Sequence, residues 1–236
     1  MNLKQPLHPA RHAERRLVTS ILDGTYPPGS SLPDERSFAK QIGVTRTTLR
    51  ETLQRLSARG WVTIRHGKST TVNDYWKEGG LGLLGSLAEY GESLPEGFIL
   101  HLLELRVVLL PPIARLAISR SPGVFRKYLD RSDRLGEDAR AFARYDWKLH
   151  MLFALHSGNP LYPLILNDFS SIFNAMALDY FNLEEGRRSS RDYYRRLLLS
   201  IEQGKGDTGK IVRSVLENSI VIWNTLMKQK KQNEGE

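Results

Sequence analysis

The sequence predicts a mainly α-helical protein: a small N-terminal domain followed by an antiparallel bundle of about seven helices. Two short helical patterns and two β-rich runs lie within residues 33–72. Beyond residue 80, apolar residues recur at helical spacing in long segments, with no convincing strand. The chain of 236 residues has room for two domains of ordinary size. We place them at residues 1–74 and 81–228, with a linker at 75–80 and a disordered tail at 229–236.

The first expected helix covers residues 10–23. Its apolar positions recur at helical spacing, namely Leu17, Val18, Ile21 and Leu22. Gly24 and the run Pro27-Pro28-Gly29 end this helix, because both residue types favour turns. Residues 1–9 contain two prolines and little periodicity. We therefore expect them to form a loose arm.

Two further helices are expected within residues 33–56. Pro33 and the two acidic residues after it suit the first turn of a short helix. Gly43 and Val44 then supply a turn, and Thr45 is the expected N-cap of a second helix. The second helix has an inward apolar stripe and an opposite face free to meet a partner. The stripe consists of Leu49, Leu53 and Leu56.

A β-hairpin is expected after the second helix. The runs 61–65 and 69–72 are rich in β-forming residues, and Gly67 lies in the turn between them. Helix, turn, helix and hairpin in this order make a winged helix-turn-helix. Residues up to 78 also carry 13 Lys or Arg against 7 Asp or Glu, out of a net charge of +8 for the chain. Because basic charge and motif coincide, this domain is interpreted as a DNA-binding domain.

The bundle is expected to consist of segments with helical periodicity joined by short turns. Pro111-Pro112 interrupts the second segment and is expected to kink or break it near Leu109. The segments are 81–90, 97–120, 124–135, 138–156, 162–180, 188–202 and 210–228.

Aromatic residues concentrate in the last 95 residues of the chain. Aromatic side chains at helical spacing pack in a core or line a pocket, and composition does not distinguish the two. The polar residues Asn167, Asn174 and Ser219, expected to face inward, favour a pocket for an amphipathic ligand.

Several classes of protein are disfavoured by composition. No apolar run approaches the roughly 20 residues of a membrane helix. The N-terminus lacks the apolar core of a signal peptide, and the chain has no cysteine, which fits a cytoplasmic protein. No Gly-rich phosphate loop or recognisable nucleophile motif is present, so we expect no enzymatic activity and no cofactor.

The helix-turn-helix resembles that of the GntR family of bacterial regulators. The resemblance is carried by Leu32-Pro33-Asp34-Glu35-Arg36, by residues 43–51, by Leu56 and by Gly60-Trp61. Within that family, the sequence resembles the fatty-acid-responsive FadR branch in particular. The stretches similar to that branch are residues 45–51, Leu53-Gln54-Arg55-Leu56, Ile64-Arg65-His66-Gly67-Lys68, residues 157–162, Leu164-Ile165-Leu166-Asn167, Tyr180-Phe181 and Ile222-Trp223.

This resemblance implies a homodimeric transcription factor that binds a palindromic DNA operator and is released by long-chain fatty acyl-CoA. Such a regulator represses genes of fatty acid degradation and can activate genes of synthesis. Arginine pairs bidentately with guanine, and short hydroxyls hold phosphates. The residues that the resemblance assigns to DNA are Arg36, Thr45, Arg46, Thr47, Thr48 and Arg50, with His66, Gly67 and Lys68 from the wing.

The bundle resembles the same branch with two departures, Pro111-Pro112 and a leucine, Leu216, where the pattern has glycine. Leu216 is expected to narrow the acyl tunnel. Arg106 matches a basic position that can offset a phosphate charge, although an ion pair on the helix surface is an equal alternative. The candidate ligand-binding residues are Arg106, His150, Phe173, Tyr180, Tyr194, Ser219 and Trp223.

A competing interpretation comes from the wider branch of the family, whose bundles hold a divalent metal and sense small carboxylates. Asp146 and His150, at i and i+4, supply the first half of that pattern. The later positions carry Tyr194 and, approximately, Asn218 instead of histidine. Two of four ligands make a poor transition-metal site, so we expect none.

Overall fold

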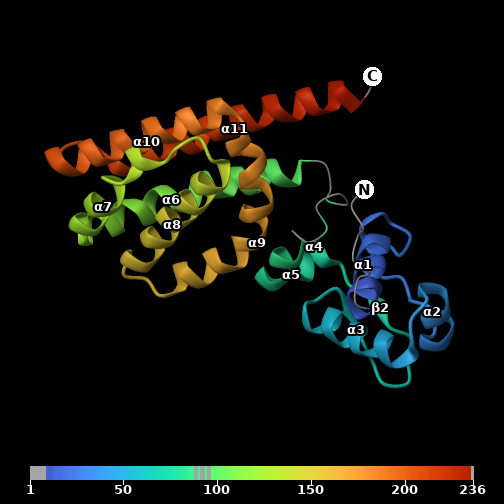
Figure 1. The fold of residues 1–236 in the computed structure, drawn as a ribbon. Helices are drawn as coiled ribbons and strands as arrows, with labels where there is room; N and C mark the ends of the chain where they lie inside the picture. The colour runs from blue at the N-terminus through green and yellow to red at the C-terminus, as the bar shows by residue number, and fades with distance from the viewer. Residues whose placement is uncertain (1–8, 88–89, 91–93, 95–96, 235–236) are drawn as a thin grey trace. The chain divides into compact units, whose positions relative to one another are not determined.

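The computed structural model describes residues 9–87, 90, 94 and 97–234, and it divides into two compact units that meet at residues 95 and 96 (Figure 1). The sequence instead places a linker at 75–80. Almost the whole expected N-terminal arm, and residues 235–236 of the expected tail, lie outside the described residues. Residues 88–89 of the helix expected at 81–90 also lie outside them.

Three helices form the body of the first unit. Helix α1 (Pro9–Leu22) packs on α3 (Arg46–Ala58), and α3 packs on α2 (Glu35–Ile42). The side chain of Asp34 caps α2 by accepting from the backbone N–H groups of Arg36 and Ser37. Gly43 ends α2 with φ of 86°, a left-handed conformation that glycine adopts freely. The inward stripe is buried as expected from its spacing, at Leu49, Leu53 and Leu56.

The hairpin after α3 is shorter than the two predicted runs. Strands β1 (Val62–Thr63) and β2 (Thr71–Val72) are antiparallel, with Val62 opposite Val72 and Thr63 opposite Thr71. Ser31 makes an isolated antiparallel bridge to Thr71. The segment between the strands is an exposed wing whose tip contains Gly67 at φ of 69°.

The segment after the hairpin also belongs to the first unit. It contains α4 (Tyr75–Glu78) and α5 (Leu81–Leu87). The indole Nε1–H of Trp61 donates a 3.1 Å hydrogen bond to the hydroxyl of Ser86, and Trp61 is fully buried. The hydroxyl of Tyr90 donates to Oε1 of Glu14 at 3.4 Å. These bonds explain why α5 lies with the DNA-binding motif rather than with the bundle.

The second unit is a bundle. It contains α6 (Phe98–Arg120), α7 (Pro122–Leu129), the 3₁₀-helix η2 (Ser132–Arg134), α8 (Ala139–His156), α9 (Leu161–Asn182), α10 (Glu184–Gln203) and α11 (Thr208–Glu234). Helix α6 packs against α8 and α11, α8 against α9, and α10 against α7 and α11. This arrangement confirms the predicted fold class, a winged helix-turn-helix followed by a helical bundle. None of the helices within the described ranges is both long and apolar enough to cross a membrane.

Of the two outcomes expected at Pro111-Pro112, a kink or a break, the break is wrong. Helix α6 runs without interruption from Phe98 to Arg120, with both prolines inside it. Each proline removes one backbone donor, so the carbonyl groups of Val107 and Val108 lose their usual partners. The apolar packing of α6 against α11 and α8 outweighs that loss. Helix α11 similarly continues to Glu234, through most of the segment expected as a tail.

Candidate functional site

Most of the residues expected to meet DNA are exposed on the first unit. The side chains of Arg36, Arg46, Thr47 and Arg50 are exposed on α2 and α3, and those of His66 and Lys68 on the wing. Thr48 is half-buried. The surface joins an arginine-bearing helix to a basic hairpin, the combination that contacts base edges and phosphates.

Two of the threonines in this set already have partners within α3. The hydroxyl of Thr45 accepts a 3.1 Å hydrogen bond from the backbone N–H of Thr48 and lies 2.9 Å from the Thr48 hydroxyl. Thr45 is therefore the N-cap that the sequence predicts. The hydroxyl of Thr45 therefore serves to start α3.

The buried carboxylate of Glu14, on α1, forms ion pairs with two arginines of α3. Oε1 of Glu14 lies 2.6 Å from Nη1 of Arg59, and Oε2 lies 3.5 Å from Nε of Arg55. Glu14 is only 8% exposed. Sequence analysis missed this cluster. The signal was a charged residue on the apolar side of the first helical pattern, directly after the buried Ala13.

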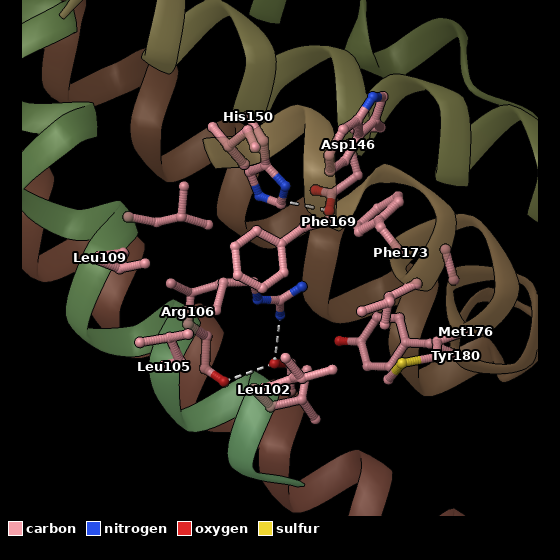
Figure 2. A pocket seen from close by; sticks show the side chains of 18 of the residues that line it. Leu102, Leu105, Arg106, Leu109, Asp146, His150, Phe169, Phe173, Met176 and Tyr180 are labelled. Carbon is pink, nitrogen blue, oxygen red and sulfur yellow. Dashed lines mark hydrogen bonds and ion pairs between the residues drawn. The ribbon is translucent and has the colours of Figure 1, made fainter. Parts of the chain in front are cut away.

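The second unit contains a cavity of about 140 Å³ between α6, α8, α9, α10 and α11. Its wall is mainly apolar, and Figure 2 shows Leu102, Leu105, Phe169 and Met176 around it. Leu105 lines the cavity and is 40% exposed. An apolar cavity of about 150 Å³ holds benzene. A long acyl chain therefore fits only if side chains in the wall move.

One guanidinium group faces this apolar wall. Nη2 of Arg106 donates a 2.9 Å hydrogen bond to the hydroxyl of Ser219, which donates in turn to the carbonyl of Leu216 at 2.6 Å (Figure 2). Burial lowers the pKa of Arg106, and the charge of Asp146 opposes that shift. An arginine still keeps its charge in a protein interior. The alternative of a surface ion pair does not apply, because no carboxylate in the described part of the chain lies within ion-pair distance of Arg106.

A second polar cluster lies beside the arginine. The hydroxyl of Tyr194 donates a 2.9 Å hydrogen bond to Oδ1 of Asp146, and Nε2 of His150 lies 3.7 Å from Oδ2. Burial lowers the pKa of His150, although Asp146 opposes the shift, and burial raises the pKa of Tyr194 well above its ordinary value. Both groups are therefore neutral near pH 7.

The structure brings most of the candidate ligand-binding residues to the cavity. Six of them line it: Arg106, His150, Phe173, Tyr180, Ser219 and Trp223. Tyr194 is fully buried behind the wall, against Asp146. The expectation that Asn167 and Asn174 face inward is wrong, because both are exposed on α9. Leu216 does line the cavity and is 3% exposed.

Sequence analysis missed Tyr193, which lines the cavity in place of its neighbour Tyr194. The helical spacing of Ser190, Tyr193 and Leu197 was the available signal, since all three are buried on α10.

A metal site would require more donors than the cluster of Asp146, His150 and Tyr194 provides. Among the residues that the structure describes, no group of three His, Cys, Asp or Glu is placed to hold an ion. Asp146 accepts from Tyr194 where a further histidine would be needed, and Asn218 bonds to Ser189 instead. The donor set does not fit a divalent transition metal.

Two family descriptions match the chain and together cover most of it. "Bacterial regulatory proteins, gntR family" matches residues 9–72, and "FadR C-terminal domain" matches residues 73–234. The second match begins near the linker expected from the sequence, ahead of the contact boundary at residue 95.

Curated relatives are similar over nearly the full chain. A "Fatty acid metabolism regulator protein" of Shewanella pealeana is 40% identical over 222 residues, covering 92% of each chain. The protein of the same description from Shewanella halifaxensis is 41% identical over the same share. Among solved structures, that described as "Lar controls the expression of the Listeria monocytogenes agr system and mediates virulence" has a TM-score of 0.54 at 17% identity, over 97% of this chain and 99% of the other. At that identity, the likeness concerns the fold alone.

Proposed function

Because the chain belongs to the GntR family of bacterial regulatory proteins and carries a FadR C-terminal domain, we propose that it regulates genes of fatty acid metabolism in response to an acyl ligand. The family is one of transcriptional regulators rather than enzymes. The finer proposal is that long-chain fatty acyl-CoA binds in the bundle and releases the DNA operator. The proposed site of action is the cytoplasm, where the operator is found.

The observation that carries this proposal is the apolar cavity with the half-buried guanidinium group of Arg106 in its wall. The wall of leucine, isoleucine and phenylalanine side chains suits an acyl chain. Arg106 offers N–H donors to the polar part of the ligand, and Ser219 positions it by accepting from its Nη2. Trp223 lies on the same helix one turn beyond Ser219. Small carboxylates need more polar partners than this wall offers.

The proposed DNA target is a palindrome bound by a homodimer. One recognition helix covers about half of a site, so two copies related by a two-fold axis read two half-sites one helical turn apart. Light scattering at micromolar concentration tests this. A dimer that binds one palindrome is expected, and a monomer both free and on DNA would contradict it.

Release requires that the ligand distinguishes two states of the protein. A ligand shifts an equilibrium only by its difference in affinity for the two states. Since a chain longer than a few carbons must displace side chains of the wall, binding is coupled to movement in the bundle. The proposed DNA-releasing state is the one in which the cavity is enlarged.

Mass spectrometry of small molecules that co-purify with the folded protein tests the ligand class. We expect long-chain acyl-CoA, recovered from the parent and depleted in a Trp223→Ala variant. Metal analysis of the same samples is the control. A stoichiometric divalent metal with a small carboxylate and without lipid would contradict the proposal.

A further inference from the structure

Two polar atoms in the wall of the cavity have no hydrogen-bond partner among the described residues. They are Nε of Arg106 and the hydroxyl oxygen of Tyr193. Tyr193 is only 3% exposed, so bulk water does not solvate its hydroxyl. Buried polar groups in proteins are nearly always hydrogen-bonded, because leaving one unpaired is unfavourable. Both groups can donate to a ligand that carries oxygen atoms.

The charges around these two atoms narrow the class of ligand. Arg106 carries a positive charge, and its one hydrogen bond to a described residue is to the neutral Ser219. The nearby carboxylate of Asp146 is directed to Tyr194 and His150 instead. The guanidinium Nε–H and the phenol O–H are both donors, and a carboxylate accepts from both in charge-assisted hydrogen bonds. Such bonds are stronger in a cavity that excludes water.

The apolar part of the wall and the volume of the cavity restrict the length of the ligand's apolar tail. Leu102, Leu105 and Phe169 lie around Arg106 in the apolar part of the cavity wall (Figure 2). A volume of about 140 Å³ is small for a chain of 16 or 18 carbons, as the comparison with benzene indicates. A medium-chain tail requires less rearrangement than a long one.

We propose that this cavity also binds free medium-chain fatty acids, with the carboxylate held between Arg106 and the Tyr193 hydroxyl and the tail against the apolar part of the wall. The inference rests on the proposed function, because both assign an acyl chain to the same cavity. It adds a second class of ligand, an ionised carboxylic acid without coenzyme A.

Binding of [1-¹³C]decanoate to the delipidated full-length protein tests this, with 1-decanol as the uncharged comparison. Calorimetry gives the affinities, and the ¹³C resonance shows whether the bound carboxylate stays ionised as pH falls. We expect decanoate to bind about tenfold more tightly than decanol, and Arg106→Met to abolish that preference. We expect Tyr193→Phe, which removes one oxygen and keeps the ring, to weaken decanoate binding about tenfold.

The matched control is Tyr128→Phe. Tyr128 donates its hydroxyl to the Tyr145 carbonyl and does not line the cavity, so this variant should bind decanoate as the parent does. Equal binding of decanoate and decanol by the parent, or unchanged decanoate binding by Tyr193→Phe, would overturn the inference. Operator release by oleoyl-CoA is measured separately. If oleoyl-CoA releases the operator but decanoate does not bind, only this inference is contradicted. If decanoate binds but acyl-CoA does not release the operator, only the proposed function is contradicted.

Discussion

Nε of Arg46 lies 3.2 Å from Oε2 of Glu35, an ion pair that joins α3 to α2 across the turn of the helix-turn-helix. The Arg46 side chain is 70% exposed, and an exposed pair of this kind contributes about 1 kcal/mol or less to stability. Arg46 can therefore leave Glu35 for a phosphate or a base at little cost. Arg50, one turn later on α3, is exposed on the same helix.

Arg50→Ala should remove discrimination between operator and random DNA. A lost bidentate contact to a base edge weakens operator binding by about 1–3 kcal/mol. Lys68→Ala, in the wing, should weaken binding to all sequences and reduce the salt dependence by about one charge. Fluorescence anisotropy at several salt concentrations measures both. Arg50→Ala protein that still prefers its operator as strongly as the parent would contradict the placement of the DNA-reading helix.

Glu14→Gln should destabilise the first unit. The substitution removes the charge that pairs with Arg55 and Arg59 on the back of α3, and hydrogen bonds to charged groups contribute about 1.5–3 kcal/mol. Thermal unfolding of the full chain measures the change. Glu217→Gln is the matched control, because its pair with Arg213 is exposed at 4.0 Å and should change stability by less than about 1 kcal/mol. Equal effects of the two substitutions would contradict a structural role for Glu14.

Pro112→Ala should stabilise the bundle. Alanine restores the backbone N–H that can bond to the Val108 carbonyl, and proline inside a helix is about 3 kcal/mol less favourable than alanine. Pro112 is exposed, so little packing is lost. Pro111→Ala also removes a buried ring and should stabilise less. A lower melting temperature for Pro112→Ala would show that the proline is needed for the shape of α6.

The bundle should lose stability as pH falls below about 6.5, the ordinary pKa of histidine. Burial lowers the pKa of His150 in the folded state, so the unfolded state takes up the proton first. Stability is therefore full above that pH and declines as the pH falls towards the lower folded-state value. His150→Gln should flatten the difference in melting temperature between pH 7.5 and about 5. An unchanged pH dependence in this variant would assign the effect to other groups.

Local chemistry accounts for the parts of the fold that were predictable. Thr45 caps the helix that follows it because a short side-chain acceptor satisfies free backbone donors at a helix start. The break expected at Pro111-Pro112 does not occur, because α6 is held by packing on two sides. Ser86 and Trp61 bond across 25 residues, which no local pattern encodes, so the contact boundary near residue 95 could not be predicted from local patterns.

The same reasoning applies to the site. The residue types of the cavity were visible as aromatic residues at helical spacing, together with Arg106 and Ser219. The pairing of Tyr194 with Asp146 joins positions 48 residues apart on two helices, so the sequence could not separate it from a ligand contact. The one-residue difference between Tyr193 and Tyr194 turns the side chain by about 100° around the helix. That rotation decides which of the two hydroxyls reaches the cavity.

Release of a labelled operator palindrome by acyl-CoA, followed by anisotropy, tests the central claim most directly. We expect oleoyl-CoA or palmitoyl-CoA to weaken operator binding, while free CoA and citrate do not. Trp223→Ala, or a bulky residue at Ser219, should leave DNA binding intact and blunt the response, because both residues line the cavity. Release by citrate that a chelator abolishes would contradict this account and favour a metal held by Asp146 and His150.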